Sequence, residues 1–404
     1  MIRRKKYIER IRPFIGKELI KVITGVRRSG KSYMLSLLQD ELRSQGVKDS
    51  HIFFYNFESI SNRPFTDDIS LYKEITKRIS KIKGKVYLFF DEIQEVKNWE
   101  KCINSFRVDF DCDIYITGSN AKLLSGELAT YIGGRYVEFT VYPLSFEEYL
   151  DGRGKLPDSS DIRDEFLRFI IYGGMPFLIN MADDKASSMQ YLKDIYNSVV
   201  LKDIIGRNNI RDVDLLERII IYIFANTGQT FSARSISNYL KNEGRKVAPE
   251  TILNYLKACL DAYLIYKFNR EDVAGKKILA VNEKYYVADH GIREAVYGNN
   301  ERDINQVLEN IVCIELLRRG YMLTVGSITE KEIDFIARKD DKIIYFQVAY
   351  LLASDEVVQR EFGAFNKIRD NFPKYVLSMD ELNMSRNGIV HMNIRDFLLT
   401  DDWE

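Results

Sequence analysis

The chain has 404 residues, more than one ordinary hydrophobic core holds, so we expect two to four domains. Charged residues make up 29% of the sequence, a share typical of a globular protein in water. Lys and Arg together number 59, and so do Asp and Glu. The resulting zero net charge excludes a basic field over the whole molecule, although it does not exclude a local basic patch.

The sequence contains no run of about 18 apolar residues, the length that a membrane-spanning helix needs. Its first residues, Met1 to Lys6, are basic but lack the apolar stretch of a secretory signal, so we expect a cytoplasmic protein. The four cysteines form no C-x-x-C pair, and with only three histidines a zinc site is not expected. We interpret the cysteines as reduced, mostly structural thiols.

A glycine-rich loop follows the first predicted strand. Residues 1–17 predict a basic helical lead-in, residues 19–24 a buried strand and residues 32–38 a helix. Between strand and helix lies the sequence Gly25-Val26-Arg27-Arg28-Ser29-Gly30-Lys31-Ser32, which fits the pattern G-x-x-x-x-G-K-[ST] at every specified position. Strand, loop and helix are the context that this motif needs, which favours a functional loop over a chance glycine turn.

This loop predicts a binding site for the phosphates of a nucleoside triphosphate. Its glycines let successive N–H groups point at one place, and the helix N-terminus adds partial positive charge there. We expect Lys31 to reach the β- and γ-phosphates and the hydroxyl of Ser32 to bind Mg²⁺. The residues expected to bind the nucleotide are Gly25, Arg27, Arg28, Ser29, Gly30, Lys31, Ser32 and Tyr33.

Two carboxylates end the third predicted strand. After a strand at 51–57 and a helix at 67–82, residues 86–91 predict an apolar strand that ends in Asp91 and Glu92. Ligands of α/β folds lie at the carboxyl ends of the strands, so Asp91 is placed to hold Mg²⁺, directly or through water. Glu92 is placed to polarise an attacking water as a general base. An acidic strand end facing solvent is the alternative, and the phosphate loop upstream favours the functional interpretation.

The next strand also runs into polar residues. Residues 113–117 predict this strand, and Ser119 or Asn120 beyond it is a candidate to sense the γ-phosphate or to orient the water, unless the segment is only an Asn-capped turn. A helix is expected at 121–132 and a strand at 136–141. Arg135, which precedes that strand, is a candidate to stabilise transition-state charge, in cis or from a neighbouring subunit, or else a surface arginine.

The phosphate loop and the segments Phe89–Glu92, Thr117–Asn120 and Gly134–Tyr136 together resemble a family of prokaryotic AAA+-like ATPases. Members carry an ATPase core followed by a domain of unknown function, DUF4143, and the resemblance covers nearly the whole chain. It implies a core with a five-stranded parallel sheet that has an extra strand between the two nucleotide motifs. The five strands expected above, near 19–24, 51–57, 86–91, 113–118 and 136–142, agree with this number.

Beyond the core, assigned to residues 1–150, a helical lid is expected over residues 151–214. A polar stretch at 151–161 predicts a linker, and residues 162–210 predict helices that are interrupted at 173–176. Arg207 and Arg211 are weak candidates to sense the nucleotide, and solvent exposure is favoured for both.

Residues 215–295 predict a winged helix-turn-helix domain. Helices are expected at 215–224, 232–240 and 249–260, and strands at 264–268 and 285–288. If this domain binds DNA, the helix from Pro249 would enter the major groove, with Asn254 and Lys257 as contacts. The helix also carries Glu250 and few arginines, so a protein-binding or purely structural role is the alternative.

Residues 296–404 resemble the PD-(D/E)xK nuclease fold. Glu309 lies in a predicted helix, and Glu332 and Asp334 share one face of a predicted strand. The next strand, however, has Gln347 and Ala349 where the fold has an acid and a lysine, so metal-dependent cleavage is expected to be lost. Recognition of nucleic acid or of a protein remains open for this domain.

The expected fold class is therefore α/β: an AAA+-like P-loop NTPase core, a helical lid, a winged helix and a nuclease-like α/β domain. The leading functional hypothesis is Mg²⁺-dependent ATP hydrolysis coupled to conformational change of the C-terminal domains. The alternatives are a nucleotide-controlled DNA-binding regulator with little turnover and, less favoured, an active nuclease. No Asn-Lys-x-Asp motif for guanine is present, so ATP is expected rather than GTP. The expected partners are DNA or a protein, and an oligomer is compatible with the sequence.

Overall fold

The computed structural model describes residues 2–121, 133–155, 161–181, 184–208, 210–273, 275, 277–328 and 331–403. The chain divides into two compact units. The first unit comprises Met1–Tyr142 together with Asp261–Tyr263, and the second comprises Pro143–Leu260 together with Leu264–Glu404. Each unit is described by itself.

The first unit contains a five-stranded sheet in the order β2-β3-β4-β1-β5, with every neighbouring pair parallel. The strands are β1 (Ile20–Thr24), β2 (Ile52–Asn56), β3 (Val86–Asp91), β4 (Cys112–Thr117) and β5 (Tyr136–Thr140). Strand β4 lies between β1, which leads into the glycine loop, and β3, which ends in Asp91. The expected parallel sheet with an extra strand between the two motifs is therefore confirmed.

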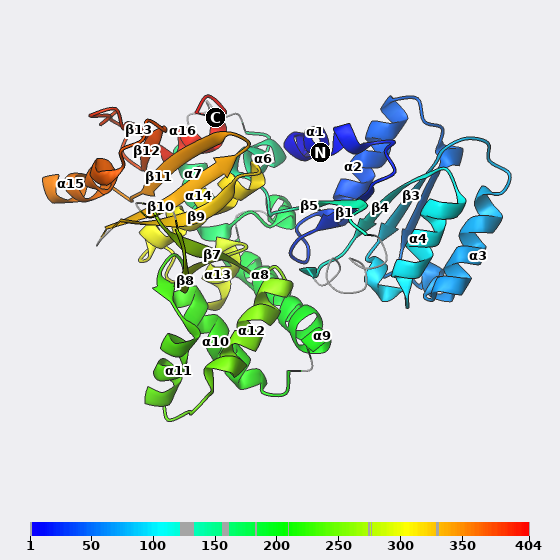
Figure 1. Cartoon of the computed structure of the whole chain (residues 1–404), viewed down its shortest axis with the longest axis horizontal. Helices are drawn as coiled ribbons and strands as arrows, with labels where there is room; N and C mark the ends of the chain where they lie inside the picture. Colours follow the sequence, from blue (N-terminus) through cyan, green and yellow to red (C-terminus); the bar gives the residue numbers. More distant parts are fainter. Residues whose placement is uncertain are drawn as a thin grey trace. The chain divides into compact units, whose positions relative to one another are not determined.

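Helices cover both faces of this sheet (Figure 1). The helices and 3-10 turns of the unit are α1 (Lys5–Ile11), η1 (Arg12–Phe14), α2 (Lys31–Ser44), η2 (Asp49–His51), η3 (Ile60–Phe65), α3 (Asp68–Ile79), η4 (Ile93–Glu95) and α4 (Trp99–Asp109). On one face, α3 and α4 bury apolar residues such as Ile75 and Phe106 against Leu88 and Ile114 of the sheet. Helix α2 covers the other face with a buried row that includes Met34 and Leu38. Of the helix expected at 121–132, residues 122–132 lie outside the described residues.

A buried ion pair joins the neighbouring strands β1 and β4 of the first unit. The ammonium of Lys21 in β1 bonds to the carboxylate of Asp113 in β4, and neither side chain is exposed. Asp113 also accepts hydrogen bonds from the backbone N–H of Gly16, across 2.7 Å, and from the hydroxyl of Tyr115, across 2.9 Å. Burial raises the pKa of Asp113 and lowers that of Lys21, and their mutual attraction opposes both shifts.

The second unit contains an eight-stranded sheet in the order β13-β12-β11-β10-β9-β7-β8-β6. Its strands are β6 (Thr230–Phe231), β7 (Ile265–Asp272), β8 (Lys277–Val287), β9 (Met322–Ile328), β10 (Lys331–Lys339), β11 (Lys342–Val348), β12 (Lys374–Ser378) and β13 (Val390–Asn393). Strands β7 and β9 pair in parallel through Arg270–Asp272 and Val325–Ser327. The sheet therefore continues across the expected domain boundary at 295/296.

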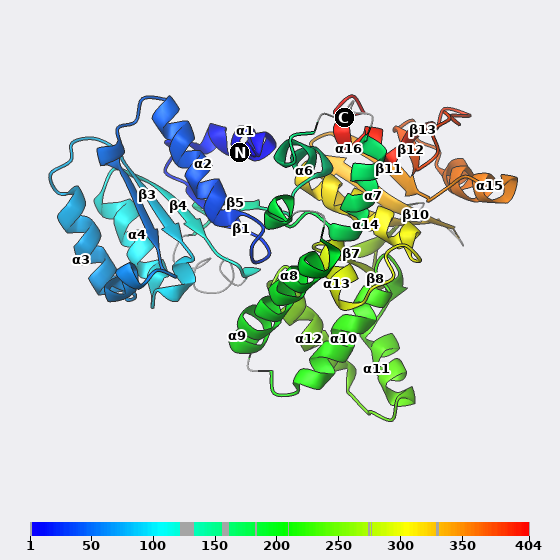
Figure 2. The ribbon, with the colours of Figure 1, turned by 180° about the vertical axis from the view of Figure 1, so that it is seen from behind.

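Helices of the second unit pack on both faces of that sheet (Figure 2). They and the shorter helical turns are α6 (Phe146–Gly152), α7 (Ile162–Tyr172), η6 (Pro176–Asn180), α8 (Lys185–Ser198), the π-helix η7 (Val199–Ile205), α9 (Gly206–Asn208), α10 (Val213–Ala225), α11 (Ala233–Asn242), α12 (Pro249–Asp261), α13 (His290–Val296), α14 (Ile304–Arg318), α15 (Asp355–Gly363), η8 (Ala364–Lys367) and α16 (Ile394–Leu399). Helices α6, α7, α14 and α16 share one apolar core with the sheet, and α15 and η8 contribute to a second.

At 173–176, where the sequence predicts a break between helices, the chain lies in close contact with the segment before α13. Gly173 has a φ of +75°, and a Cβ there would lie 2.4 Å from Oδ1 of Asp289. The N–H of Gly174 donates to Oδ2 of the same carboxylate across 2.8 Å. A Cβ on Gly291 would lie 2.0 Å from the carbonyl oxygen of Tyr172. Glycine is therefore required at these positions because backbone and carboxylate approach so closely.

Candidate functional site

The glycine loop connects β1 to α2 at the carboxyl edge of the sheet. Gly25 has a φ of +133°, and a Cβ there would lie 2.2 Å from the carbonyl oxygen of Val141. Gly30, with a φ of +100°, is the N-cap of α2, which begins at Lys31. Both glycines thus occupy positions that a larger residue would strain, and the first turn of α2 follows the loop directly.

Inside the loop, two side chains have polar atoms positioned for a phosphate. The Nζ of Lys31 donates to the carbonyl oxygens of Gly25 and Val26 across 3.1 and 3.2 Å. The hydroxyl of Ser29 is fully buried and has no hydrogen-bond partner among the described residues. A buried hydroxyl without a partner is costly unless a ligand completes its bonding, so the loop fits an anionic phosphate group.

Asp91, the last residue of β3, accepts hydrogen bonds from side chains at the ends of the two neighbouring strands. Its Oδ1 accepts from the hydroxyl of Thr117 across 2.6 Å, and its Oδ2 accepts from Nδ2 of Asn56 across 2.9 Å. Burial raises the pKa of this carboxyl, whereas hydrogen bonds from Thr117 and Ser32 and the charge of Lys31 oppose the shift. Asp91 and Ser32, the two expected Mg²⁺ ligands, are therefore side by side, and a carboxylate with a hydroxyl is a donor set that suits Mg²⁺.

Glu92 follows Asp91 in a left-handed backbone conformation, with a φ of +55°. Its N–H donates to the hydroxyl of Thr117 across 2.8 Å, so Thr117 bonds to both acidic residues. Its carboxylate lies 3.9 Å from Nζ of Lys31 and accepts hydrogen bonds from Ser119, across 3.4 Å, and from Gln94. A non-glycine residue held at positive φ by such bonds is typical of a functional site.

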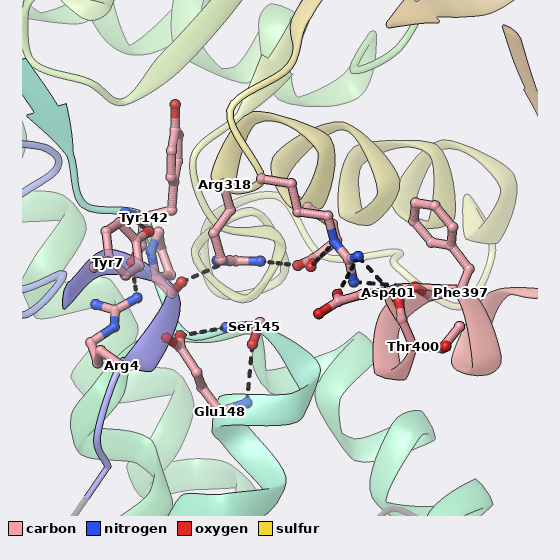
Figure 3. A network of polar contacts seen from close by, with 12 residues as sticks. Arg4, Tyr7, Tyr142, Ser145, Glu148, Arg318, Phe397, Thr400 and Asp401 are labelled. Atoms are coloured by element: carbon pink, nitrogen blue, oxygen red, sulfur yellow. Dashed lines mark hydrogen bonds and ion pairs between the residues drawn. The ribbon is translucent and has the colours of Figure 1, made fainter. Parts of the chain in front are cut away.

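The N-terminal segment bonds to the phosphate loop and, as Figure 3 shows, to Tyr142. Arg4, which is 2% exposed, donates from Nη1 to the carbonyl oxygen of Ser29 across 2.9 Å and from Nη2 to that of Tyr142 across 2.7 Å. Its guanidinium lies 4.7 Å from the ring centre of Tyr7, whose hydroxyl accepts from the N–H of Tyr142 across 3.0 Å. The lead-in is thus bonded to the phosphate loop and to the last residue of the first unit.

Figure 3 also draws a set of bonds within the second unit. Ser145 and Glu148 form a capping box at the start of α6, and Arg318 donates to the carbonyl oxygen of Pro143 across 2.8 Å. Glu315 is buried between Arg318 and Arg319. The bond from Arg318 ties Pro143, the first residue of the second unit, to α14.

Other expected nucleotide-binding residues lie around the loop with partners of their own. Arg27 pairs with Glu58 across 3.2 Å, and Arg28 is exposed with a φ of +66°. The hydroxyl of Tyr33 donates to the backbone carbonyl of Ile2 across 3.0 Å. Asn120 is 1% exposed, close in the chain to Ser119, which bonds to Glu92.

Arg135 lies away from the phosphate loop. It is exposed, and its carbonyl oxygen accepts from the N–H of Ile20, the first residue of β1. The loop begins beyond Thr24 at the other end of this five-residue strand, which spans about 16 Å. Within one chain, the backbone of Arg135 therefore lies at the sheet edge opposite Lys31.

Sequence reasoning missed Asn56, Thr117 and Arg4 as parts of this site. A usable signal existed for Asn56 and Thr117, because each is the last residue of a strand whose carboxyl end lies beside that of β3. No comparable signal marks Arg4, since one buried arginine cannot be distinguished from its basic neighbours by pattern alone.

The sites expected in the second unit are also located by the structure. Asn254 and Lys257 are exposed on α12, and Arg211 is exposed. Arg207 pairs with Asp203 across 3.4 Å. Glu309 of α14 and the β10 residues Glu332 and Asp334 gather around a lysine of β8, which sequence reasoning did not connect with them.

Comparison with known protein families agrees with this geometry. The sequence model of the AAA domain family AAA_14 matches residues 17–150. With the parallel sheet and the glycine loop, this match defines the first unit as an AAA-type P-loop nucleotide-binding domain. A second family, the domain of unknown function DUF8612, matches residues 163–303. This match does not support the DUF4143 assignment that the resemblance implied.

Two relatives extend over most of the chain. A protein of Haemophilus influenzae with the name "Uncharacterized protein" is 39% identical over 400 residues, which are 99% of each chain. "Uncharacterized protein MJ1544" of Methanocaldococcus jannaschii is 34% identical over 380 residues, covering 90% of this chain and 81% of the relative. The chain belongs to the protein family of these two relatives.

Two solved structures show partial similarity to this chain. They are the ORC1 protein of Aeropyrum pernix in complex with DNA and Cdc6p of Pyrobaculum aerophilum. The first is 12% identical, with a TM-score of 0.32, and the match covers 75% of this chain and 93% of that one. The second is 10% identical, with a TM-score of 0.29, over 74% and 93%. Scores this low carry no argument about function.

Across the described parts of the chain, no helix is both long and apolar enough to cross a bilayer.

Proposed function

We propose that the protein hydrolyses ATP at the carboxyl edge of the first unit's sheet. The observation that supports this most directly is the network around Thr117, which bonds to both Asp91 and Glu92, with Lys31 3.9 Å from Glu92. A phosphate-binding loop, a carboxylate for a metal and a second carboxylate for water are the groups that phosphoryl transfer to water requires. We take the nucleotide to be ATP because the sequence lacks a guanine-recognition motif.

In this proposal, the loop residues bind and orient the triphosphate. The ammonium of Lys31 gives up its hydrogen bonds to the carbonyl oxygens of Gly25 and Val26 and donates to the β- and γ-phosphate oxygens instead. The hydroxyl of Ser29 gains a hydrogen-bond partner. The N-terminus of α2 adds its partial positive charge. Asp91 and Ser32 would hold Mg²⁺, which when bound neutralises charge on the phosphate oxygens.

Glu92 orients the attacking water and accepts its proton. Its carboxylate is held by Ser119 and Gln94, so the water-facing oxygen has a defined position. Asn120 is proposed to sense the γ-phosphate from the end of β4. Arg135 lies at the opposite sheet edge, so a role in charge stabilisation is proposed only from a neighbouring subunit, in an oligomer.

The test is steady-state ATP hydrolysis with nucleotide binding measured in parallel. Lys31→Ala is expected to lose both binding and turnover, whereas Glu92→Gln is expected to bind ATP and to lose turnover by at least about 100-fold. Glu95→Gln is the matched control, because Glu95 lies in η4 three residues beyond Glu92. Turnover of Glu92→Gln at the wild-type rate would contradict the general-base assignment.

Nucleotide-controlled DNA binding is a second candidate. Asn254 and Lys257 are exposed on α12, as major-groove contacts must be, although the same face exposes Leu253, which suits a protein partner better. Fluorescence anisotropy with duplex DNA at low salt, with and without ATP, tests this proposal, and Lys257→Ala should weaken any binding. Absence of DNA binding under all these conditions would direct the search toward a protein partner.

A further inference from the structure

A lysine ammonium lies buried among three carboxylates in the second unit. Lys284 in β8 is 2% exposed. Its Nζ lies 2.6 Å from Oε1 of Glu332, 2.8 Å from Oε1 of Glu309 and 3.4 Å from Oδ1 of Asp334. The carboxylates come from α14 and β10, so side chains of separate elements converge on one point. Hard oxygen atoms around a common centre are the surroundings in which proteins hold cations such as Ca²⁺ and Mg²⁺.

Further hydrogen bonds hold two of these carboxylates in place. The hydroxyl of Tyr286 donates to Oε1 of Glu309 across 2.6 Å, so this oxygen receives both the phenol and the ammonium. The N–H of Val348 donates to Oδ2 of Asp334 across 2.9 Å. The cluster is therefore preorganised, and its oxygens do not depend on an outside ion for their orientation.

The ammonium is stable in this position. Burial opposes the charge on Lys284, but the carboxylates of Glu309, Asp334 and Glu332 outweigh burial and raise its pKa. Burial and the charge of Glu309 raise the pKa of Asp334, and the charge of Lys284 opposes this shift. Arg270 adds a second positive charge 4.0 Å from Glu332.

We propose that Lys284 is the built-in cation of this carboxylate cluster and that it keeps divalent metal ions out. A divalent ion at the same centre would meet the ammonium at contact distance, where like charges repel strongly in a buried site. Within the described ranges, no group of three or more His, Cys, Asp or Glu side chains is arranged to hold a metal ion. The nuclease-like core is therefore a salt-bridged structural site and not a metal centre.

If Lys284 excludes divalent ions, its replacement should create a metal site. Replacing Lys284 by a neutral side chain of similar length removes the resident cation and leaves three carboxylates around the vacated volume. Such a variant should bind a divalent ion that compensates the negative charge of the carboxylates, because uncompensated buried carboxylates are strongly unfavourable. The wild-type chain should gain nothing from the same ion at this site.

The experiment is Mn²⁺ binding to the full-length chain without nucleotide, followed by electron paramagnetic resonance and by the thermal unfolding midpoint. Wild type and the control Lys267→Met, which alters a partly exposed lysine of β7 paired with Glu283, are expected to bind no Mn²⁺ at this cluster. Lys284→Met is expected to bind one Mn²⁺ and to unfold several degrees higher when it is added. Lys284→Met/Asp334→Asn should lose most of that binding.

The proposal is overturned if folded wild type binds Mn²⁺ and Asp334→Asn or Glu309→Gln abolishes that binding. It is also overturned if folded Lys284→Met binds none. Should Lys284→Met fail to fold, wild type and Asp334→Asn decide the question, because equal Mn²⁺ binding by these two chains supports exclusion. A Mn²⁺-dependent DNA cleavage by wild type that Asp334→Asn removes would contradict the proposal as well.

Discussion

The guanidinium of Arg4 donates to the carbonyl oxygen of Ser29 across 2.9 Å, joining the N-terminal segment to the phosphate loop. The same side chain donates to the carbonyl oxygen of Tyr142 across 2.7 Å. Arg4 is buried in a left-handed backbone conformation with a φ of +42°, which a non-glycine residue adopts only when its surroundings hold it. We infer that Arg4 positions the loop and does not itself contact the nucleotide.

Arg4→Ala is expected to raise the KM for ATP by about tenfold or more, because a hydrogen bond to a charged group contributes about 1.5–3 kcal/mol. Arg4→Lys, with one ammonium for two carbonyls, should restore part of this loss. Arg12→Ala is the matched control, because Arg12 follows in the same segment and pairs with Glu41 at the surface. An unchanged KM in Arg4→Ala, measured by steady-state hydrolysis, would contradict the positioning role.

Thr117→Val should slow turnover by about 10- to 100-fold, since residues that orient a ligand carboxylate typically contribute this much. The hydroxyl holds Asp91 and the backbone of Glu92 at once, and valine keeps the shape but removes both bonds. Affinity for ATP without metal should change little. Thr66→Val, at a partly exposed threonine outside the site, serves as control, and a parallel loss of turnover there would deny Thr117 a specific role.

Asp91→Asn should change how the stability of the metal-free protein depends on pH. Burial raises the pKa of Asp91 above its ordinary value of 3.8, so the folded state binds this proton more readily than the unfolded state. Asp91 then stabilises the fold below its ordinary pKa, and this contribution is lost as the pH rises through the raised pKa. The unfolding free energy of wild type minus that of Asp91→Asn should therefore fall from about pH 4 toward neutrality. Urea unfolding at a series of pH values measures it, and a constant or rising difference would refute the assignment.

Lys21→Met should destabilise the first unit by about 3–5 kcal/mol, because it leaves the carboxylate of Asp113 buried without its cation. The double variant Lys21→Met/Asp113→Asn should recover much of this loss, since the uncompensated charge is then absent. Chemical unfolding of wild type, Lys21→Met, Asp113→Asn and the double variant gives the coupling free energy between the two side chains. Additive losses would show that the two side chains act independently.

The nucleotide-binding half of the fold was predictable because its signals are local. The glycine loop, the strand ending in Asp91 and the strand ending in Thr117 can each be recognised from a few consecutive residues, and parallel strands bring their carboxyl ends to one edge. The structure places Lys31, Asp91 and Glu92 together, as the sequence led us to expect. Their chemical roles remain predictions.

What the sequence did not predict depends on contacts between distant segments. The loop is held by Arg4, and the carboxylates of Glu309 and Asp334 surround Lys284, which lies on a strand outside the segment that resembles a nuclease. Strand β9 was not expected, and its parallel pairing with β7 merges the predicted winged-helix and nuclease-like regions into one sheet. Local patterns do not encode such pairings, because both partners must be known before either contact can be inferred.

In the proposed reaction, Glu92 activates water for hydrolysis of a nucleotide held by Lys31. The most direct measurement is the identity of the nucleotide that stays bound after wild type, Glu92→Gln and Lys31→Ala are mixed with radiolabelled ATP and Mg²⁺ and rapidly separated from free nucleotide. We expect ADP on wild type, intact ATP on Glu92→Gln and no nucleotide on Lys31→Ala. Recovery of ADP from Glu92→Gln at the wild-type rate, or intact ATP from wild type after prolonged incubation, would contradict it.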